Sequence, residues 1–124
     1  MWIGKTKLFA KWADKEGLTD AILAQAIAEI RAGSVEANLG GDVYKKRIAM
    51  PGRGKSGGAR TLVAFKKEDK AFFIYGFKKN ERANIKPDEL QALKLYAKQL
   101  LALDESGINE MLRAGTMIEV NNDG

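Results

Sequence analysis

The stretch from Gly52 to Arg60 has the clearest chemical potential, because it combines glycine with cationic side chains. Four of its nine residues are glycines and three are Lys or Arg. Glycine allows positive φ angles and close approach of the backbone to a ligand, and Lys and Arg donate to phosphate oxygens. Apolar and aromatic runs flank the stretch, so we expect a connection between rigid strands, where binding sites are common. The alternative is a flexible basic hairpin loop without a partner.

This stretch differs from the phosphate-binding loop of nucleoside triphosphatases. Gly54-Lys55-Ser56 fits the end of that motif, but the first glycine of the motif would fall at Ala49. The motif also opens a helix, whereas the run from Thr61 to Phe65 is typical of a strand. The glycines therefore do not indicate a nucleotide site of that kind.

More cations lie on the strands that the sequence predicts around this stretch. On a strand over 43–50, Lys45 and Arg47 share one face and the residues between them share the other. Arg60 begins a second strand, and Lys79 follows a third strand directly. In an antiparallel meander these four side chains converge on one basic surface. We expect Arg60 and Lys79 to be surface groups on it.

Such a surface suits a phosphodiester backbone, with salt-dependent affinity. RNA also carries its own nucleophile, the 2′-hydroxyl, so cleavage needs only a base, an acid and charge stabilisation of the transition state. A lysine crowded by cations has a favoured neutral form and can serve as base or acid. Glu81 is either a base, an orienting group or a surface charge, and Tyr75 is either a proton donor or a core aromatic.

Composition limits the other possibilities. The chain has 124 residues, which suits one domain over 1–124 with a polar tail from about 121. It has no cysteine and no histidine, which excludes thiol chemistry and the commonest metal ligand. We expect no metal and no other cofactor. No run is long enough for a membrane span and no signal peptide is evident, so we expect a cytoplasmic protein.

Charge is distributed unevenly along the chain. Residues 44–86 hold 13 Lys or Arg and 3 Asp or Glu, a local charge of +10, while the remainder carries −5. A basic middle within an acidic frame favours a polyanionic partner over an ordinary solvated surface.

The order of the predicted elements gives an α+β fold. Two amphipathic helices come first, then three strands joined by short loops, then helices again. The predicted elements are a short edge strand over 2–5, helices over 6–15 and from Thr19 or Asp20 to Gly33, a loop over 34–42, strands over 43–50, 60–65 and 71–77, helices from Pro87 and over 106–114, and a strand over 116–120.

Several segments together resemble toxins of bacterial type II toxin–antitoxin modules, in the RelE/ParE superfamily, and most closely the RelE-type branch with its HigB-like relatives. The pattern Gly-Lys-Ser-Gly-Gly-x-Arg, followed by Gly-Phe-x-Lys-Asn-Glu, is the most specific part. The segments that carry the resemblance are Phe9-Ala10-Lys11-Trp12, Leu39-Gly40-Gly41, Lys45-Lys46-Arg47, Gly52 to Arg60, Tyr75 to Arg82 and Leu100 to Leu103.

The resemblance implies N-terminal helices packed on a twisted antiparallel sheet, with a C-terminal helix. It implies a metal-independent endoribonuclease that cuts mRNA, free or on the ribosome, and so arrests translation. It also implies a cognate antitoxin, with a helix-turn-helix domain, that covers the basic surface. The positions expected to be catalytic are Arg60, Lys79, Arg47 and Glu81, and those expected to contact RNA are Lys45, Arg53, Lys55, Ser56, Lys78, Asn80 and Arg82.

The chain departs from the family's pattern after the third strand. The best-studied ribosome-dependent type has a catalytic tyrosine there, but residues 82–86 contain none, and Asn80 stands where an arginine is expected. Two alternatives therefore stay open: a gyrase inhibitor of the ParE type, and an inactive member that only binds RNA or an antitoxin.

Overall fold

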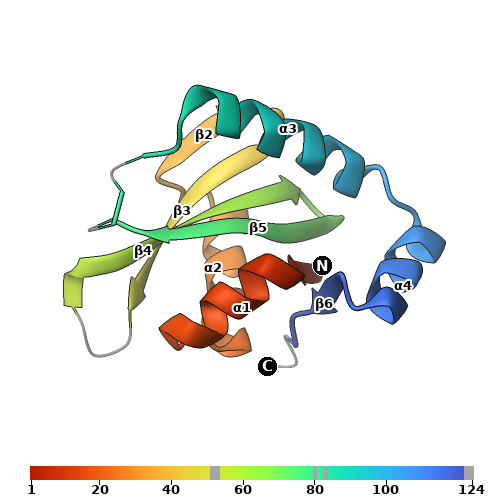
Figure 1. Cartoon of the computed structure of the whole chain (residues 1–124), viewed down its shortest axis with the longest axis horizontal. Helices are drawn as coiled ribbons and strands as arrows, with labels where there is room; N and C mark the ends of the chain where they lie inside the picture. Colours follow the sequence, from red (N-terminus) through yellow and green to blue (C-terminus); the bar gives the residue numbers. More distant parts are fainter. Residues whose placement is uncertain (51–53, 80, 83, 122–124) are drawn as a thin grey trace.

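The computed structural model describes residues 1–50, 54–79, 81, 82 and 84–121, with the side chains of 50 and 54–57 left aside. A six-stranded sheet in the order β2-β3-β4-β5-β1-β6 has helices on both faces (Figure 1). This confirms the predicted α+β class. The elements are β1 (Trp2–Thr6), α1 (Lys7–Glu16), α2 (Asp20–Arg31), β2 (Ala37–Gly40), β3 (Val43–Met50), β4 (Gly54–Lys66), β5 (Lys70–Lys78), α3 (Pro87–Leu101), α4 (Glu105–Ala114) and β6 (Met117–Glu119).

The sheet is mixed rather than wholly antiparallel. Strands β3 to β5 form the predicted antiparallel meander, and β2 extends it by one antiparallel strand. Strand β1, however, runs parallel to β5, with Trp2 opposite Lys70 and Lys5 opposite Phe73. Strand β6 then pairs with the other side of β1. The prediction of an edge strand over 2–5 was therefore wrong, because the C-terminal strand occupies the position beyond it.

Two boundaries differ from the predictions around the meander. The predicted loop over 34–42 contains β2, a four-residue strand that pairs with β3. Strand β4 begins at Gly54 instead of Arg60, and Met50 pairs with Gly54 beyond a shift in register after Ile48. Most of the glycine-rich stretch is thus strand, and residues 51–53 lie outside the described residues.

The helix ends follow ordinary capping chemistry, which explains why they were predictable. The Thr6 side chain accepts a hydrogen bond from the Phe9 amide at the start of α1, and Thr19 caps α2 in the same way. Gly17 ends α1 with φ of 77°, a left-handed conformation that favours glycine. Pro87 is the first residue of α3, as expected from its fixed φ.

Strand β5 lies between two apolar layers, as its unbroken run of aromatic residues predicted. Phe73 faces α1 and α2 and stacks on Phe9 with ring centroids 5.0 Å apart. Phe72 faces α3 on the other side of the sheet. Both side chains are fully buried. Trp12 also belongs to the core, as predicted, and its ring lies directly against Gly76 of β5.

Replacing Gly76 with alanine should destabilise the protein by about 1–3 kcal/mol, the usual cost of overpacking. A Cβ atom at this position would lie 2.3 Å from the Trp12 ring, so the ring must move. Chemical denaturation of Gly76→Ala measures the change in unfolding free energy. The double variant with Trp12→Ala supplies the control: its loss should be smaller than the sum of the two single losses. Additive losses would contradict the assignment of a steric clash.

Candidate nucleic-acid interface

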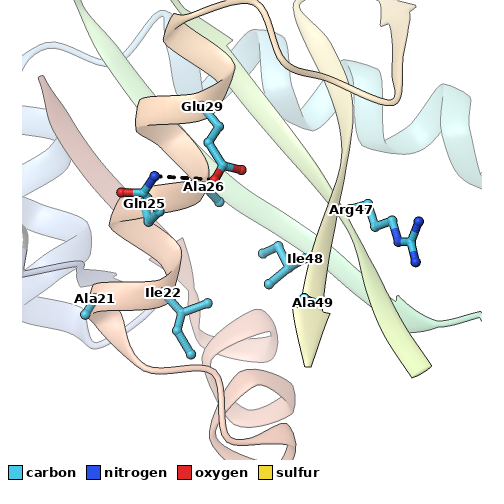
Figure 2. A pocket seen from close by; sticks show the side chains of 8 residues that line it. All are labelled: Ala21, Ile22, Gln25, Ala26, Glu29, Arg47, Ile48 and Ala49. Atoms are coloured by element: carbon cyan, nitrogen blue, oxygen red, sulfur yellow. Dashed lines mark hydrogen bonds between the residues drawn. The ribbon is translucent and has the colours of Figure 1, made fainter. Parts of the chain in front are cut away.

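The alternation of β3 separates its cations onto two faces of the sheet. Lys46 points toward α2, where its Nζ lies 2.8 Å from Glu29 Oε1 and donates to the Ser34 carbonyl at 3.0 Å. Figure 2 shows Ile48 also directed toward α2, while Arg47 extends to the other side of the strand. The prediction that Lys45 and Arg47 share a face opposite Lys46 agrees with this geometry.

The register of the meander then brings cations from different strands into line. Arg47 lies directly opposite Arg60, and Arg60 lies opposite Phe77 of β5. Directly opposite residues of paired strands point to the same face of a sheet. Arg47, Arg60 and Phe77 therefore form one row across β3, β4 and β5, which we call the arginine row.

Arg60 does not have the exposed position that the sequence suggested. Arg60 is only 8% exposed to solvent, and its Nε forms an ion pair with Oε2 of Glu36 at 2.7 Å. Lys45 Nζ lies 4.0 Å from Oε1 of the same carboxylate. The expectation of a surface arginine was wrong because a carboxylate covers it, and a cation can be buried when it is paired.

Glu36 was not among the predicted site residues. It stands immediately before β2, and its amide donates to the Lys45 carbonyl at 2.8 Å, which extends the pairing of β2 with β3. The only signal in the sequence was a short alternation, in which Val35, Ala37 and Leu39 are apolar and Glu36 and Asn38 are polar. Since β2 itself was not predicted, nothing placed this acid beside the cations.

Two predicted site residues belong to the other face. Lys78 lies opposite Ala59, whose side chain is part of the core under α1 and α2. Its Nζ lies 3.5 Å from Glu16 of α1 and 3.2 Å from Glu81. The structure therefore groups Lys78 and Glu81 with α1 and not with the arginine row, while Lys79 is exposed at the following position.

Arg82 holds the segment after β5 against α3. Its Nη1 donates to the Tyr75 hydroxyl at 2.9 Å and to Glu89 at 3.2 Å, and its Nη2 also donates to Glu89. The guanidinium carbon lies 5.9 Å from the centre of the Phe77 ring. These contacts place Arg82 beside Phe77, at the end of the arginine row, with its guanidinium bonded to Tyr75 and Glu89.

The ion pair between Arg82 and Glu89 shifts the pKa values of both side chains. The hydrogen bonds from Arg82 hold the pKa of the Glu89 carboxyl below its usual value, and the amide of Lys86 adds to this effect. The same pair raises the pKa of Arg82. Tyr75 lies half-buried beside α3 and accepts the bond from Arg82, so it borders the site as well as the core.

The remaining predicted residues receive no side-chain placement. Arg53 and Asn80 lie outside the described residues, and Lys55 and Ser56 belong to β4 but their side chains are not described. Within the described ranges, no three or more Asp or Glu side chains are grouped so that they could hold a metal ion. No helix in that part of the chain is long and apolar enough to cross a membrane.

Comparison with known families bears directly on this fold and its basic face. A family model described as the RelE toxin of the RelE / RelB toxin-antitoxin system matches residues 1–120. The chain belongs to the RelE toxin family. This membership supports the role of a toxin of a toxin–antitoxin system for the chain. RelE-family toxins pair with a cognate antitoxin. The match extends from before β1 to just past β6. Comparison with curated protein sequences gave no match.

Removing Arg60 should cost stability, whereas removing Arg47 should not. Arg60→Ala leaves Glu36 without its closest cation and opens space in a buried position, so we expect a loss of about 1–3 kcal/mol. Arg47 is exposed, and Arg47→Ala should change the unfolding free energy by less than about 0.5 kcal/mol. Urea denaturation of both variants measures the difference. Equal stability of the two variants would contradict the buried ion pair.

The pairing of Arg82 with Glu89 should appear in the pH dependence of stability. Because the folded state lowers the pKa of Glu89 from 4.5, the pair stabilises the fold above that value and loses its effect as pH falls through the lower folded value. Carbon-detected NMR titration of the Glu89 carboxyl should show this lowered pKa. In Arg82→Met the pKa should rise toward 4.5, and an unchanged titration would mean that Arg82 does not hold Glu89.

Proposed function

We propose that this RelE-family toxin is a metal-independent endoribonuclease that cuts mRNA and thereby arrests translation. Toxins of the family generally cleave mRNA. The observation that carries the proposal is the direct opposition of Arg47 and Arg60 across β3 and β4, with Lys45 on the same face. Like charges directly opposite each other destabilise a sheet, so this pair of arginines favours a functional role in holding an anion.

The roles of the two arginines differ because their exposures differ. Arg47 is exposed and can grip a phosphate with two parallel hydrogen bonds. Arg60 is fixed by Glu36, so its charge is already in place beneath the position where a phosphate bound to Arg47 would sit. Fixed charge of this kind stabilises the extra negative charge of the transition state without reorganisation.

Other cations extend this surface in the proposal. Lys45 lies beside the row, and the start of β4, with Lys55 and Ser56, is adjacent to it in the β3–β4 hairpin. Lys79 is exposed at the end of β5. We assign these residues, with Arg53 and Asn80, to binding the RNA backbone, which is consistent with few groups that could read bases.

The proposed setting is the cytoplasm, with mRNA either free or held on the ribosome. The proposed antitoxin carries a helix-turn-helix domain and an acidic segment that covers the arginine row. Opposite charge on the two partners would speed their association and exclude RNA from the same face.

Mapping of new RNA 5′ ends after induction of the toxin alone tests the function. We expect new ends within coding sequences, together with growth arrest, and loss of both in Arg47→Ala, since cleavage needs the exposed arginine. Ends locked to the codon frame would indicate cleavage on the ribosome. Lys66→Ala is the matched control because it removes one exposed cation from the distant β4–β5 turn. It should leave cleavage unchanged.

Other outcomes would point to the alternatives. Growth arrest without new RNA ends would contradict the nuclease proposal and favour an inhibitor of another macromolecular machine, such as gyrase. Absence of both arrest and new ends would leave a protein that only binds RNA or its antitoxin. Full toxicity of Arg47→Ala, with new ends intact, would show that the arginine row is not the site.

A further inference from the structure

We propose that Glu36 is the general base of this site and takes the proton from the attacking 2′-hydroxyl of the RNA. This inference rests on the proposed function, since it names the group that starts the same cleavage. Neither histidine nor the predicted candidate Glu81 can fill the role: the chain has no histidine, and Glu81 is paired with Lys78 on the side of α1.

The position of Glu36 supports this role. Its carboxylate touches Arg60 at 2.7 Å and approaches Lys45 at 4.0 Å, so it lies at the arginine row itself. Its side chain is 34% exposed, whereas that of Arg60 is 9% exposed. A ligand that reaches the row can therefore meet the carboxylate as well as the exposed Arg47.

The carboxylate is also held in place. The backbone of Glu36 is fixed by the hydrogen bond from its amide to the Lys45 carbonyl, and one carboxylate oxygen is fixed by Arg60. The other oxygen, Oε1, lies at the longer distance of 4.0 Å from Lys45, and a carboxylate oxygen can accept a further hydrogen bond. A base must be held within hydrogen-bond reach of its proton to be effective.

The ion pairs of Glu29 and Glu89 include neither Lys45 nor Arg60. Glu29 pairs with Lys46 beneath α2, and Glu89 is held by Arg82 and by the amide of Lys86. Among the acids whose ion pairs the structure describes, Glu36 is the one paired with both Lys45 and Arg60.

The chemical step balances with water as the only further participant. Glu36 accepts the 2′-hydroxyl proton, the 2′-oxygen forms a bond to phosphorus, and the bond from phosphorus to the 5′-oxygen breaks. The 5′-oxygen takes up a proton from water and leaves as a hydroxyl, and Glu36 returns its proton to solvent. The products are a 2′,3′-cyclic phosphate and a 5′-hydroxyl end, with no oxidation or reduction.

The test compares cleavage by the wild-type toxin, Glu36→Gln and Glu29→Gln. Glutamine keeps the size of the side chain and an oxygen toward Arg60 but cannot accept the proton. Single-turnover cleavage of a defined mRNA, alone and in a purified translation system, should fall by about 10²–10⁴-fold in Glu36→Gln. Binding of the 2′-O-methyl form of the RNA, which cannot be cut, should change by less than about threefold.

The pH profile separates a base from a positioning residue. Among the described residues, the cations that form ion pairs with Glu36 are Lys45 from β3 and Arg60 from β4. The wild-type rate should fall as pH drops through the range where a carboxylate takes up a proton. The residual rate of Glu36→Gln should lack this acidic decline. Glu29→Gln changes a similar Glu–Lys pair on the other face and should keep both rate and profile.

Each result decides between distinct conclusions. If the wild-type toxin cuts no RNA in either setting, the proposed function fails and this inference fails with it. If the wild-type toxin cuts and Glu36→Gln cuts within threefold of it, or keeps the acidic decline, only the inference fails. Parallel loss of cleavage and RNA binding in Glu36→Gln would likewise overturn it, because Glu36 would then only position Arg60. Thermal unfolding of each variant confirms that it is folded.

Discussion

The register of β3 against β4 is the constraint on which the rest of this structure depends. A shift of one residue in a strand moves every side chain to the opposite face of the sheet. Here that shift would place Lys45 and Arg47 under α2, and Lys46 and Ile48 on the face of the arginine row. The buried Thr61 hydroxyl donates to the Lys46 carbonyl at 3.0 Å, which helps to fix this register from within the core. The chemistry on one face is thus determined by packing on the other.

The sequence supports prediction best where local chemistry decides the structure. Helix ends were predictable because Thr6, Thr19, Gly17 and Pro87 have conformational preferences that do not depend on distant residues. The two-residue period of β3 was likewise enough to separate its cations. The family was also accessible from the sequence, because its glycine and lysine pattern survives in a continuous stretch of chain.

Tertiary contacts account for what the sequence did not show. Glu36 reaches Arg60 only because the short β2 folds back along β3, and four residues that include a glycine give no strong strand pattern. Arg82 is similar: its partners Tyr75 and Glu89 lie seven residues away on either side, on a strand and a helix whose approach the sequence does not specify. The local sequence around an arginine does not show whether its side chain will bind RNA or hydrogen-bond to other parts of the fold.

The place of β1 in the sheet has a consequence for how the protein is made. Residues 2–6 are made before the rest of the sheet, yet they pair with β5, about 70 residues later, and with β6, more than 110 residues later. The meander from β2 to β5, which bears the arginine row, consists of neighbouring segments and can pair sooner. Strand β1 must wait for its distant partners β5 and β6, because closure of long loops precedes its contacts. The sheet of this toxin is therefore complete only after β6, at residues 117–119, has been made.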